Sequence, residues 1–219
     1  MTVKLNHYWA IKPEKKKQYG KFIINEFVPG VNKLGLHTVA GWSVVVGAYS
    51  EIIFETVAND LDLLERALRN PRYQQLKVSL FKYIKKYKTK VLVNTDKKNT
   101  YSTDIQEDTV KFNQMWDVLS DHTDEFDRFT KDSFYPALES LGITVAQEWE
   151  VLIGDGPHII CEGRVDNVSN LITSLQSKEF REAKQTLRNY VENYESRILS
   201  FHIQKVKGYK SASYNIIGD

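Results

Sequence analysis

The chain has 219 residues, 42% of them hydrophobic, and a formal net charge of +2 at pH 7. This composition is typical of a soluble globular protein. The longest apolar runs have the length of a strand and the first residues show no signal layout, so we expect neither a membrane span nor a secretory leader. A single cysteine, Cys161, excludes an intrachain disulfide and favours a cytoplasmic location.

The sequence repeats itself at a constant offset of 107 residues, without a gap. Such self-similarity indicates two fused copies of one domain. We therefore predict a first repeat over residues 1–95, a linker over 96–108, and a second repeat with a C-terminal tail over 109–219. The clearest matched pairs are Trp9/Trp116, Pro29/Pro136, Gly35/Gly142, Trp42/Trp149 and Glu55/Glu162.

The first elements of each repeat are a strand and a long helix. Residues 4–11 are aromatic and apolar strand formers that stop before Pro13, a residue suited to the first turn of a helix. Apolar residues then recur at helical spacing until Gly35, where the helix should end. Pro29 and Pro136 fall inside this helix and each removes a backbone hydrogen bond, so we expect a kink or break in both copies.

A hairpin and two short helices follow. Residues 38–46 and 51–58 are apolar runs separated by a turn, which predicts a hairpin. Asn59-Asp60 should begin one short helix and Asn70-Pro71 a second. We assign Tyr73 to Tyr87 to the apolar stripe of this second helix, and Thr89 to Val93 to the last strand. The second copy should repeat all of these elements.

This order is β-α-β-β-α-β, which predicts an α+β fold made of two tandem ferredoxin-like repeats. Helices would cover one face of each sheet and leave the other face bare. We expect the bare faces to be apolar and to pack together within the chain, as an intrachain dimeric α/β barrel. The polar segment from Asn94 to Asp108 is long enough to connect the two sheets.

The two halves differ in charge. Residues 1–95 carry 16 Lys and Arg against 7 Asp and Glu, a charge of +9, and the remainder carries 14 against 21, a charge of −7. Opposite charges favour docking of the halves or self-association of chains, although two solvated surfaces that drifted apart in charge would give the same pattern. Strand three reads Glu51-Ile52-Ile53-Phe54-Glu55 and lacks a basic-aromatic signature, so we expect no nucleic acid partner.

The stretch from Gly41 to Glu55, continued by residues 61–66 and 70–73, resembles the dimeric α/β-barrel superfamily. Within it, the chain looks most like the NIPSNAP branch and, more loosely, the antibiotic-biosynthesis monooxygenase branch. The resemblance implies a small-molecule-binding barrel, with cofactor-independent oxygenation of an aromatic or apolar substrate as its most specific version. The alternative that it implies is a non-catalytic structural or interaction protein with a filled barrel.

The resemblance also bears on haem, because haem-binding members with two repeats use a His on a helix of the second repeat. No His occurs between Asp166 and Ser196. The five His residues are scattered, none is shared by both copies, and no spacing suits a metal. We therefore predict no haem, no metal and no other cofactor.

Candidate site residues are the polar and aromatic positions that both copies share. Asn6/Asn113 and Glu55/Glu162 are the catalytic candidates. The mid-strand amide either binds a ligand or is satisfied by backbone groups, and the glutamate either binds a ligand or lies at a strand end, exposed or paired with Lys or Arg. Trp42, Tyr83 and Tyr87, with their counterparts Trp149, Tyr190 and Tyr194, are either core residues or the wall of an aromatic pocket. If a pocket exists, we expect the five positions of a repeat to line it together, on the helix-covered side of the sheet.

Overall fold

A computed structural model describes residues 2–47, 52–99, 109–206 and 213–217. The described chain divides into two compact units. Unit 1 holds residues 2–44, 52–93 and the described residues from 201 onward, and unit 2 holds residues 45–47, 94–99 and 109–200. The described residues from 201 onward, which the prediction placed within 109–219 as the second repeat and its tail, are thus part of unit 1.

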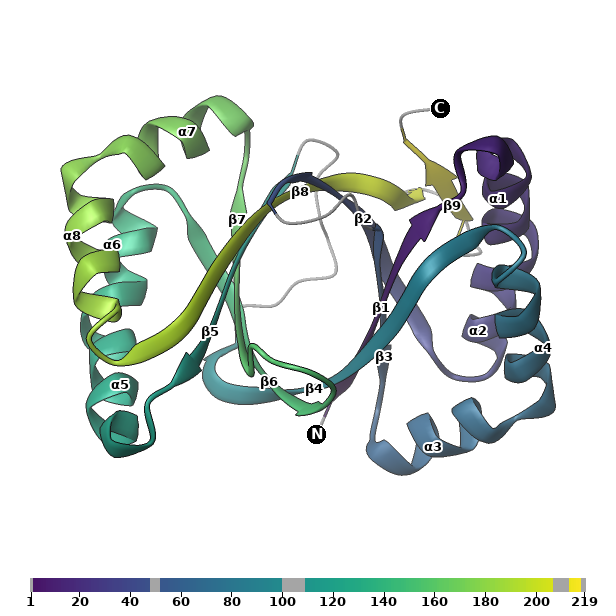
Figure 1. Cartoon of the computed structure of the whole chain (residues 1–219), viewed down its shortest axis with the longest axis horizontal. Coiled ribbons are helices and arrows are strands. Elements are labelled where there is room, and N and C mark those ends of the chain that lie inside the picture. The colour runs from purple at the N-terminus through teal and green to yellow at the C-terminus, as the bar shows by residue number, and fades with distance from the viewer. Residues whose placement is uncertain (1, 48–51, 100–108, 207–212, 218–219) are drawn as a thin grey trace. The chain divides into compact units, whose positions relative to one another are not determined.

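Unit 1 is an antiparallel sheet with helices on one face (Figure 1). Strands β2, β3, β1 and β4 are neighbours in that order, and the end of β8 lies beside β2. Its elements are β1 (Val3–Ile11), α1 (Lys16–Phe22), α2 (Val28–Lys33), β2 (His37–Val46), β3 (Ile52–Ala58), α3 (Leu61–Arg69), α4 (Pro71–Leu80), the first part of β4 (Ile84–Asn99), the end of β8 (Val191–Val206), and β9 (Ser213–Ile216).

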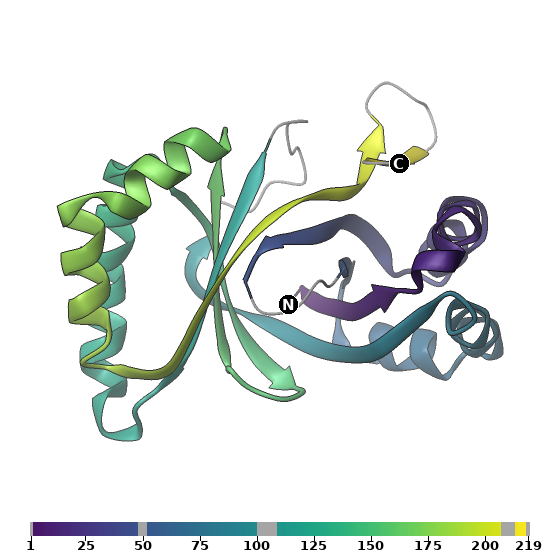
Figure 2. The ribbon, with the colours of Figure 1, turned by 45° about the horizontal axis from the view of Figure 1, so that its top comes forward.

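Unit 2 has the same architecture, and its four helices cover one face of the sheet in both views (Figures 1 and 2). The strand order is β6, β7, β5 and β8, and the end of β4 lies beside β6. Each element follows its unit 1 counterpart by 107 residues: β5 (Val110–Val118), α5 (Thr123–Phe129), α6 (Tyr135–Ser140), β6 (Thr144–Ile153), β7 (Ile159–Val165), α7 (Val168–Gln176), α8 (Lys178–Leu187) and β8.

Local sequence explains most element boundaries. The helix that contains Pro29 passes through a π-helical turn over Ile23–Phe27, and the helix that contains Pro136 does the same over Thr130–Phe134. A proline cannot donate the usual helical hydrogen bond, so the ladder rearranges just before it, and the predicted kink or break takes the form of a π-helical turn. Gly35 (φ 85°) and Gly142 (φ 76°) end these helices in the left-handed region.

The short helices also begin where the sequence predicts. The Asp60 side chain accepts a hydrogen bond from the Leu63 amide at 2.6 Å, and Asn167 accepts one from the Asn170 amide at 2.8 Å. These side-chain caps satisfy amides that have no partner inside the helix. Asn70 and Ser177 cap α4 and α8 in the same way.

Two assignments are wrong at the ends of α4 and α8. Helix α4 stops at Leu80, so Ile84 and Tyr87 lie on strand β4 and not on a helical stripe. Tyr83 lies in the turn between α4 and β4, where its carbonyl accepts a hydrogen bond from the Lys12 amide at 2.9 Å. Strand β4 continues to Asn99, into the segment predicted as a linker; the rest of that linker lies outside the described residues.

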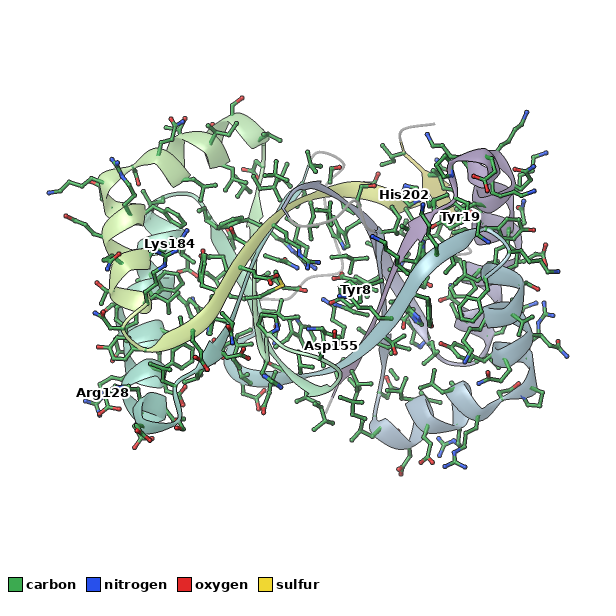
Figure 3. The ribbon with its side chains drawn as sticks, in the orientation of Figure 1. Tyr8, Tyr19, Arg128, Asp155, Lys184 and His202 are labelled. Atoms are coloured by element: carbon green, nitrogen blue, oxygen red, sulfur yellow. The ribbon has the colours of Figure 1, made fainter. Side chains whose placement is uncertain are left out.

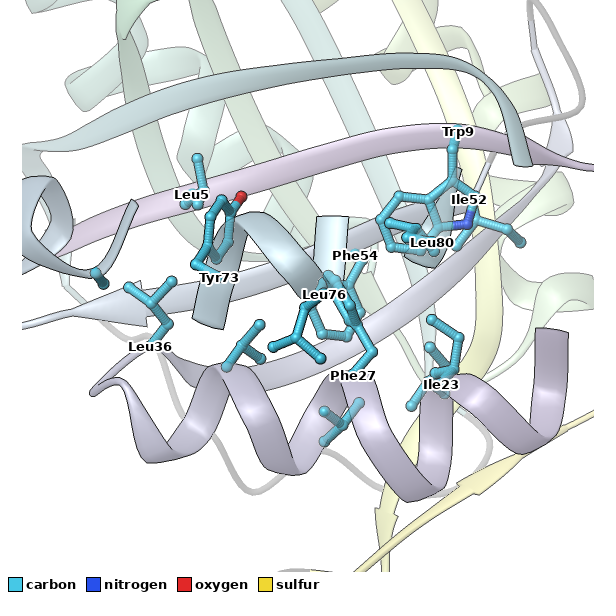
Figure 4. Packing of buried hydrophobic residues seen from close by; sticks show 14 of the residues in the cluster. Leu5, Trp9, Ile23, Phe27, Leu36, Ile52, Phe54, Tyr73, Leu76 and Leu80 are labelled. Atoms are coloured by element: carbon cyan, nitrogen blue, oxygen red, sulfur yellow. The ribbon is translucent and has the colours of Figure 1, made fainter. Parts of the chain in front are cut away.

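The apolar core of unit 1 lies between its sheet and its helices. Figure 4 shows Phe27, Phe54 and Leu76 meeting in this layer, with Trp9 and Leu80 beside them. The equivalent layer of unit 2 contains Cys161, which is fully buried as predicted (0% exposed). Burial and the nearby Glu148 and Glu162 carboxylates raise the pKa of the Cys161 thiol well above its usual value.

The helix-free sheet faces are buried but not apolar, which corrects the prediction. In unit 1 this face carries Lys4, Asn6, Glu55 and Lys90, all at most 5% exposed. In unit 2 the polar residues of the same face are Lys111, Asn113, Glu162 and Arg197. Buried charges are costly unless they are paired, so these residues need partners of opposite charge.

Candidate functional site

The predicted residues Asn6, Trp42 and Glu55 lie together on the helix-free face of unit 1. Lys4 Nζ is 3.1 Å from Glu55 Oε1, and the Trp42 indole donates to Glu55 Oε2 at 3.0 Å. Asn6 pairs with Glu55 across strands β1 and β3 and its amide approaches the Tyr8 hydroxyl at 3.4 Å. The Glu55 carboxylate is therefore held by a lysine and an indole, which is a structural arrangement.

Unit 2 repeats the ion pair of unit 1. Lys111 Nζ lies 2.8 Å from Glu162 Oε1, and both side chains are at most 2% exposed. Asn113 pairs with Glu162 across strands β5 and β7. The interpretation that Glu55 and Glu162 pair with a lysine is thus confirmed, whereas an exposed position at a strand end is wrong, because both lie within their strands.

The predicted tyrosines lie on the other face of each sheet. Tyr83 and Tyr87 pack on the helix-side core of unit 1, and Tyr190 and Tyr194 pack on that of unit 2. Tyr87 is hydrogen-bonded to His7 Nδ1 at 2.9 Å, and the Tyr194 hydroxyl donates to Gln114 Oε1 at 2.8 Å. One pocket lined by all five positions of a repeat is therefore excluded. The sheet separates the tyrosines from Asn6, Trp42 and Glu55 in unit 1, and from Asn113, Trp149 and Glu162 in unit 2.

A groove of about 570 Å³ lies elsewhere, in unit 2. Its size is that of a small-molecule site. The end of β4, the end of β5, helix α5, strand β6 and the start of β7 supply its walls, and none of the predicted site residues is among them. The lining residues are Asn94, Thr95, Lys97, Asp117, Val118, Thr123, Phe126, Asp127, Glu150, His158 and Ile159.

An aspartate and a histidine are joined at the wall of this groove. Asp117 Oδ1 lies 2.6 Å from His158 Nδ1 and accepts the His158 backbone amide at 2.8 Å. Asp117 Oδ2 accepts from Asn193 at 2.9 Å. Burial alone would raise the pKa of Asp117, but the hydrogen bonds from Asn193 and His158 outweigh it and hold that pKa below its usual value.

This geometry fixes the state of the imidazole. Because Nδ1 faces a carboxylate, the proton of a neutral His158 lies on Nδ1 and the lone pair on Nε2. The His158 side chain is 61% exposed and lines the groove, so a small molecule can reach it. The pair is therefore equipped to remove a proton from a bound molecule.

A second charged cluster lies where β4 crosses helix α5. Lys97 Nζ is 2.6 Å from Asp127 Oδ1 and 2.9 Å from Glu148 Oε1, and it lies 4.3 Å from the centroid of the Phe126 ring. The Tyr135 hydroxyl donates to the other oxygen of Glu148. Burial raises the pKa of Glu148, and Lys97 opposes that shift.

Unit 1 has small neutral residues at the positions equivalent to the acidic residues of the groove and of the Lys97 cluster. The counterparts of Asp117, Asp127, Glu148 and Glu150 are Ala10, Gly20, Gly41 and Ser43. Ile203 packs directly on Gly41, so closely that a Cβ atom there would lie 2.8 Å from its side chain. Tyr19, the counterpart of Phe126, stacks on His202 with the ring centroids 5.7 Å apart (Figure 3).

The groove residues were missed because the sequence was searched for polar residues that both copies share. The useful signal was the opposite one: positions that are small and neutral in one copy and acidic in the other. These same substitutions contribute to the negative charge of the second half. A search for divergent positions would have found Asp117, Asp127, Glu148 and Glu150.

Within the described parts of the chain, no three His, Cys, Asp or Glu side chains come together in a way that could hold a metal ion. No helix in those parts has the length and apolar character needed to cross a bilayer.

No protein-family model matches this sequence, and no curated protein matches it. Solved structures do share its fold. They include a proposed monooxygenase from Fusobacterium nucleatum (9% identity, 99% of this chain and 95% of that chain, TM-score 0.66) and one from Lactobacillus acidophilus (11%, 97% and 98%, 0.58). An anthrone oxidase-like protein is also similar (14%, 90% and 90%, 0.57). At these identities the likeness shows a shared fold and nothing further, and that fold is the one that the resemblance implies.

Proposed function

We propose that this chain binds a small molecule with an apolar or aromatic body in the groove of unit 2. The observation that carries the proposal is the Asp117–His158 pair on the wall of a groove of about 570 Å³. Val118, Phe126 and Ile159 supply apolar surface beside it. A site that combines apolar walls with a few convergent polar groups is typical of small-molecule binding.

The reaction that we propose is cofactor-independent oxygenation. His158 Nε2 removes a proton from an electron-rich aromatic substrate, and Asp117 stabilises the imidazolium that forms. The resulting carbanion gives its electrons to dioxygen; one oxygen atom enters the product as a carbonyl and the other leaves as water. Support comes from the general-base geometry and from the fold shared with two proposed monooxygenases and an anthrone oxidase-like protein.

Binding and oxygen uptake with anthrone test the proposal. We expect anthrone to raise the melting temperature of the wild-type protein and to be oxidised to the quinone with uptake of one dioxygen. His158→Gln should bind anthrone and lose at least about a hundredfold in oxygen uptake, as expected for loss of a general base. His37→Gln is the matched control, because His37 is exposed at the start of β2 in unit 1.

Failure of each part has a distinct signature. Binding without oxygen uptake by the wild-type chain would remove the oxygenase and keep the binding role. If no aromatic compound shifts the melting temperature or perturbs the groove residues, the binding role itself is wrong.

The alternative function is a structural or interaction protein of the NIPSNAP-like kind. It is favoured by the helix-free face of unit 1, where the buried Glu55 carboxylate contacts both Lys4 and Trp42. The packing of the two sheets into one barrel and self-association through oppositely charged halves stay predictions.

A further inference from the structure

The groove of unit 2 already holds one ammonium group. Lys97 Nζ contacts the Asp127 and Glu148 carboxylates at 2.6 and 2.9 Å and lies 4.3 Å from the centre of the Phe126 ring. Its side chain is only 16% exposed. Two carboxylates and an aromatic face are the groups with which proteins bind ammonium ligands. This end of the groove is therefore suited to a cation.

The remaining groove residues have an excess of negative charge. Three carboxylates, those of Asp117, Asp127 and Glu150, line the groove with one ammonium, so its formal charge is −2 when His158 is neutral. The Glu150 side chain is exposed, and among the described residues no side chain pairs with it. A free carboxylate on an acidic wall attracts cations and repels anions.

We propose that the ligand of this groove is an organic cation, an ammonium group on an apolar or aromatic body. Glu150 is the carboxylate that is free to pair with the ammonium, and Val118, Phe126 and Ile159 receive the body. This inference rests on the proposed binding role of the groove and adds the charge of its ligand. It applies to unit 2 alone, because the counterparts of Asp117, Asp127 and Glu150 in unit 1 are neutral.

Three probes with one phenylethyl body test the sign of the charge. They are 2-phenylethylamine, 2-phenylethanol and 3-phenylpropanoate, a cation, a neutral molecule and an anion at pH 7. Each is titrated into the full chain, and the methyl NMR signals of Val118 and Ile159 report binding in the groove. We expect the amine to bind about tenfold tighter than the alcohol at low salt, and the carboxylate to bind more weakly than both. Added salt should reduce the preference.

Two variants identify the groups responsible. Glu150→Gln should weaken amine binding about threefold and leave alcohol binding unchanged. Glu179→Gln, on the exposed first turn of α8, is its control. Lys97→Met should tighten amine binding about threefold, because it removes the competing ammonium. Lys98→Met is its control, since Lys98 pairs with Glu139 outside the groove.

The outcomes separate this inference from the proposed function. Equal affinity for the amine and the alcohol would overturn the inference that the ligand is a cation, and so would an unchanged amine affinity in Glu150→Gln. Either result would keep the groove as a binding site. If none of the three probes perturbs Val118 or Ile159, the proposed function fails as well. Glu150 is on the surface, so its variant reports on the charge even if Lys97→Met does not fold.

Discussion

Units 1 and 2 use the same elements in the same order, but they fill the end of the sheet under the first helix differently. In unit 1 this region is packed with Ile203 on Gly41 and with Tyr19 on His202. In unit 2 the same region holds Lys97, Asp127 and Glu148, and an open groove beside them. One copy has closed the region with apolar contacts and the other has kept it polar and open.

The comparison separates residues that build the fold from residues that can act on a ligand. The polar pairs that both copies retain, Lys4–Glu55 and Lys111–Glu162, are buried ion pairs between neighbouring strands of one sheet. The charges of the groove occur in one copy only. In a chain with two copies, a shared polar residue is thus first a packing residue, and a divergent charge on a cavity wall is the better indicator of function.

The largest expected loss in the free energy of unfolding comes from removing the end of β8, which completes the sheet of unit 1. Phe201 stacks on Trp42 at 4.3 Å, Ile203 is fully buried, and Tyr214 donates to the Thr38 carbonyl at 3.0 Å. A chain truncated after Ser200 loses these three side chains, each worth about 2 kcal/mol of burial, so unit 1 should lose about 5 kcal/mol or more. Denaturant unfolding followed by tryptophan fluorescence measures this loss.

A matched pair of substitutions sharpens this test. Ile203→Ala should cost about 2–4 kcal/mol, because it leaves a cavity against Gly41. At its counterpart in the other copy, Asp96→Asn changes an exposed residue, keeps a residue type that tolerates the left-handed backbone there (φ 62°), and should stay within about 0.5 kcal/mol. A truncated chain that unfolds like the full chain would contradict the assignment of residues 201–206 and 213–217 to unit 1.

The next largest loss in the free energy of unfolding is expected from neutralising the buried glutamate of each unit, and it should be equal in the two units. Glu55→Gln and Glu162→Gln each leave a buried lysine without its counter-charge, which costs about 3–5 kcal/mol. Glu65→Gln is the control, because its pair with Arg69 is exposed and is worth about 0.5 kcal/mol or less. Melting with and without an aromatic ligand distinguishes the roles. A ligand-dependent shift that disappears in Glu55→Gln or Glu162→Gln would restore these residues as binding residues.

Much of the fold could be predicted, because local chemistry determines it. Pro29, Gly35 and Asp60 act through their own backbone or the next turn, and their effects appear where the sequence places them. The end of α4 could not be predicted. It follows from a backbone contact with a distant part of the chain: the Lys12 amide donates to the Tyr83 carbonyl at 2.9 Å, as the Leu119 amide donates to the Tyr190 carbonyl at 3.0 Å in unit 2.

The same limit applies to the predicted linker and to the site. Residues Asn94–Asn99 are polar and read as a linker, yet they form a strand because β6 is beside them. Their pairing brings Lys97 to Asp127, a contact that spacing in the sequence cannot reveal. Composition identified the acidic second half, but only the folded sheet places Asp117 against His158.

A third prediction exchanges one residue between the copies. Burial lowers the pKa of His7 from 6.5 to about 3, and its counterpart Gln114 does not titrate. Between pH 6.5 and about 3 the unfolded chain binds a proton at His7 that the folded chain does not, so stability falls as the pH falls. Gln114 makes the equivalent hydrogen bond to Tyr194, so His7→Gln should keep the contact to Tyr87.

The variant should therefore differ little from the wild type at pH 7.5 and be more stable at pH 4.5, by roughly 2–3 kcal/mol. Urea unfolding at the two pH values measures the difference. Gln114→His is the reciprocal change and should introduce the same acid sensitivity into unit 2. Equal pH dependence of the wild type and His7→Gln would contradict a neutral, buried His7.

The smallest expected effect is at Cys161, whose counterpart in unit 1 is the core residue Phe54. The thiol is fully buried, and its raised pKa keeps it protonated, while thiol reagents react with the exposed thiolate. Labelling by a disulfide reagent at pH 7.5 should therefore proceed only through opening of unit 2, roughly a hundredfold or more slower than in urea. Glu148→Gln, which removes a nearby negative charge but leaves the thiol buried, should not change that rate beyond its effect on stability. Rapid labelling of the native chain would show that the layer between the sheet and the helices of unit 2 opens readily. The difference between the packed region of unit 1 and the open groove of unit 2 would then extend to the core of unit 2.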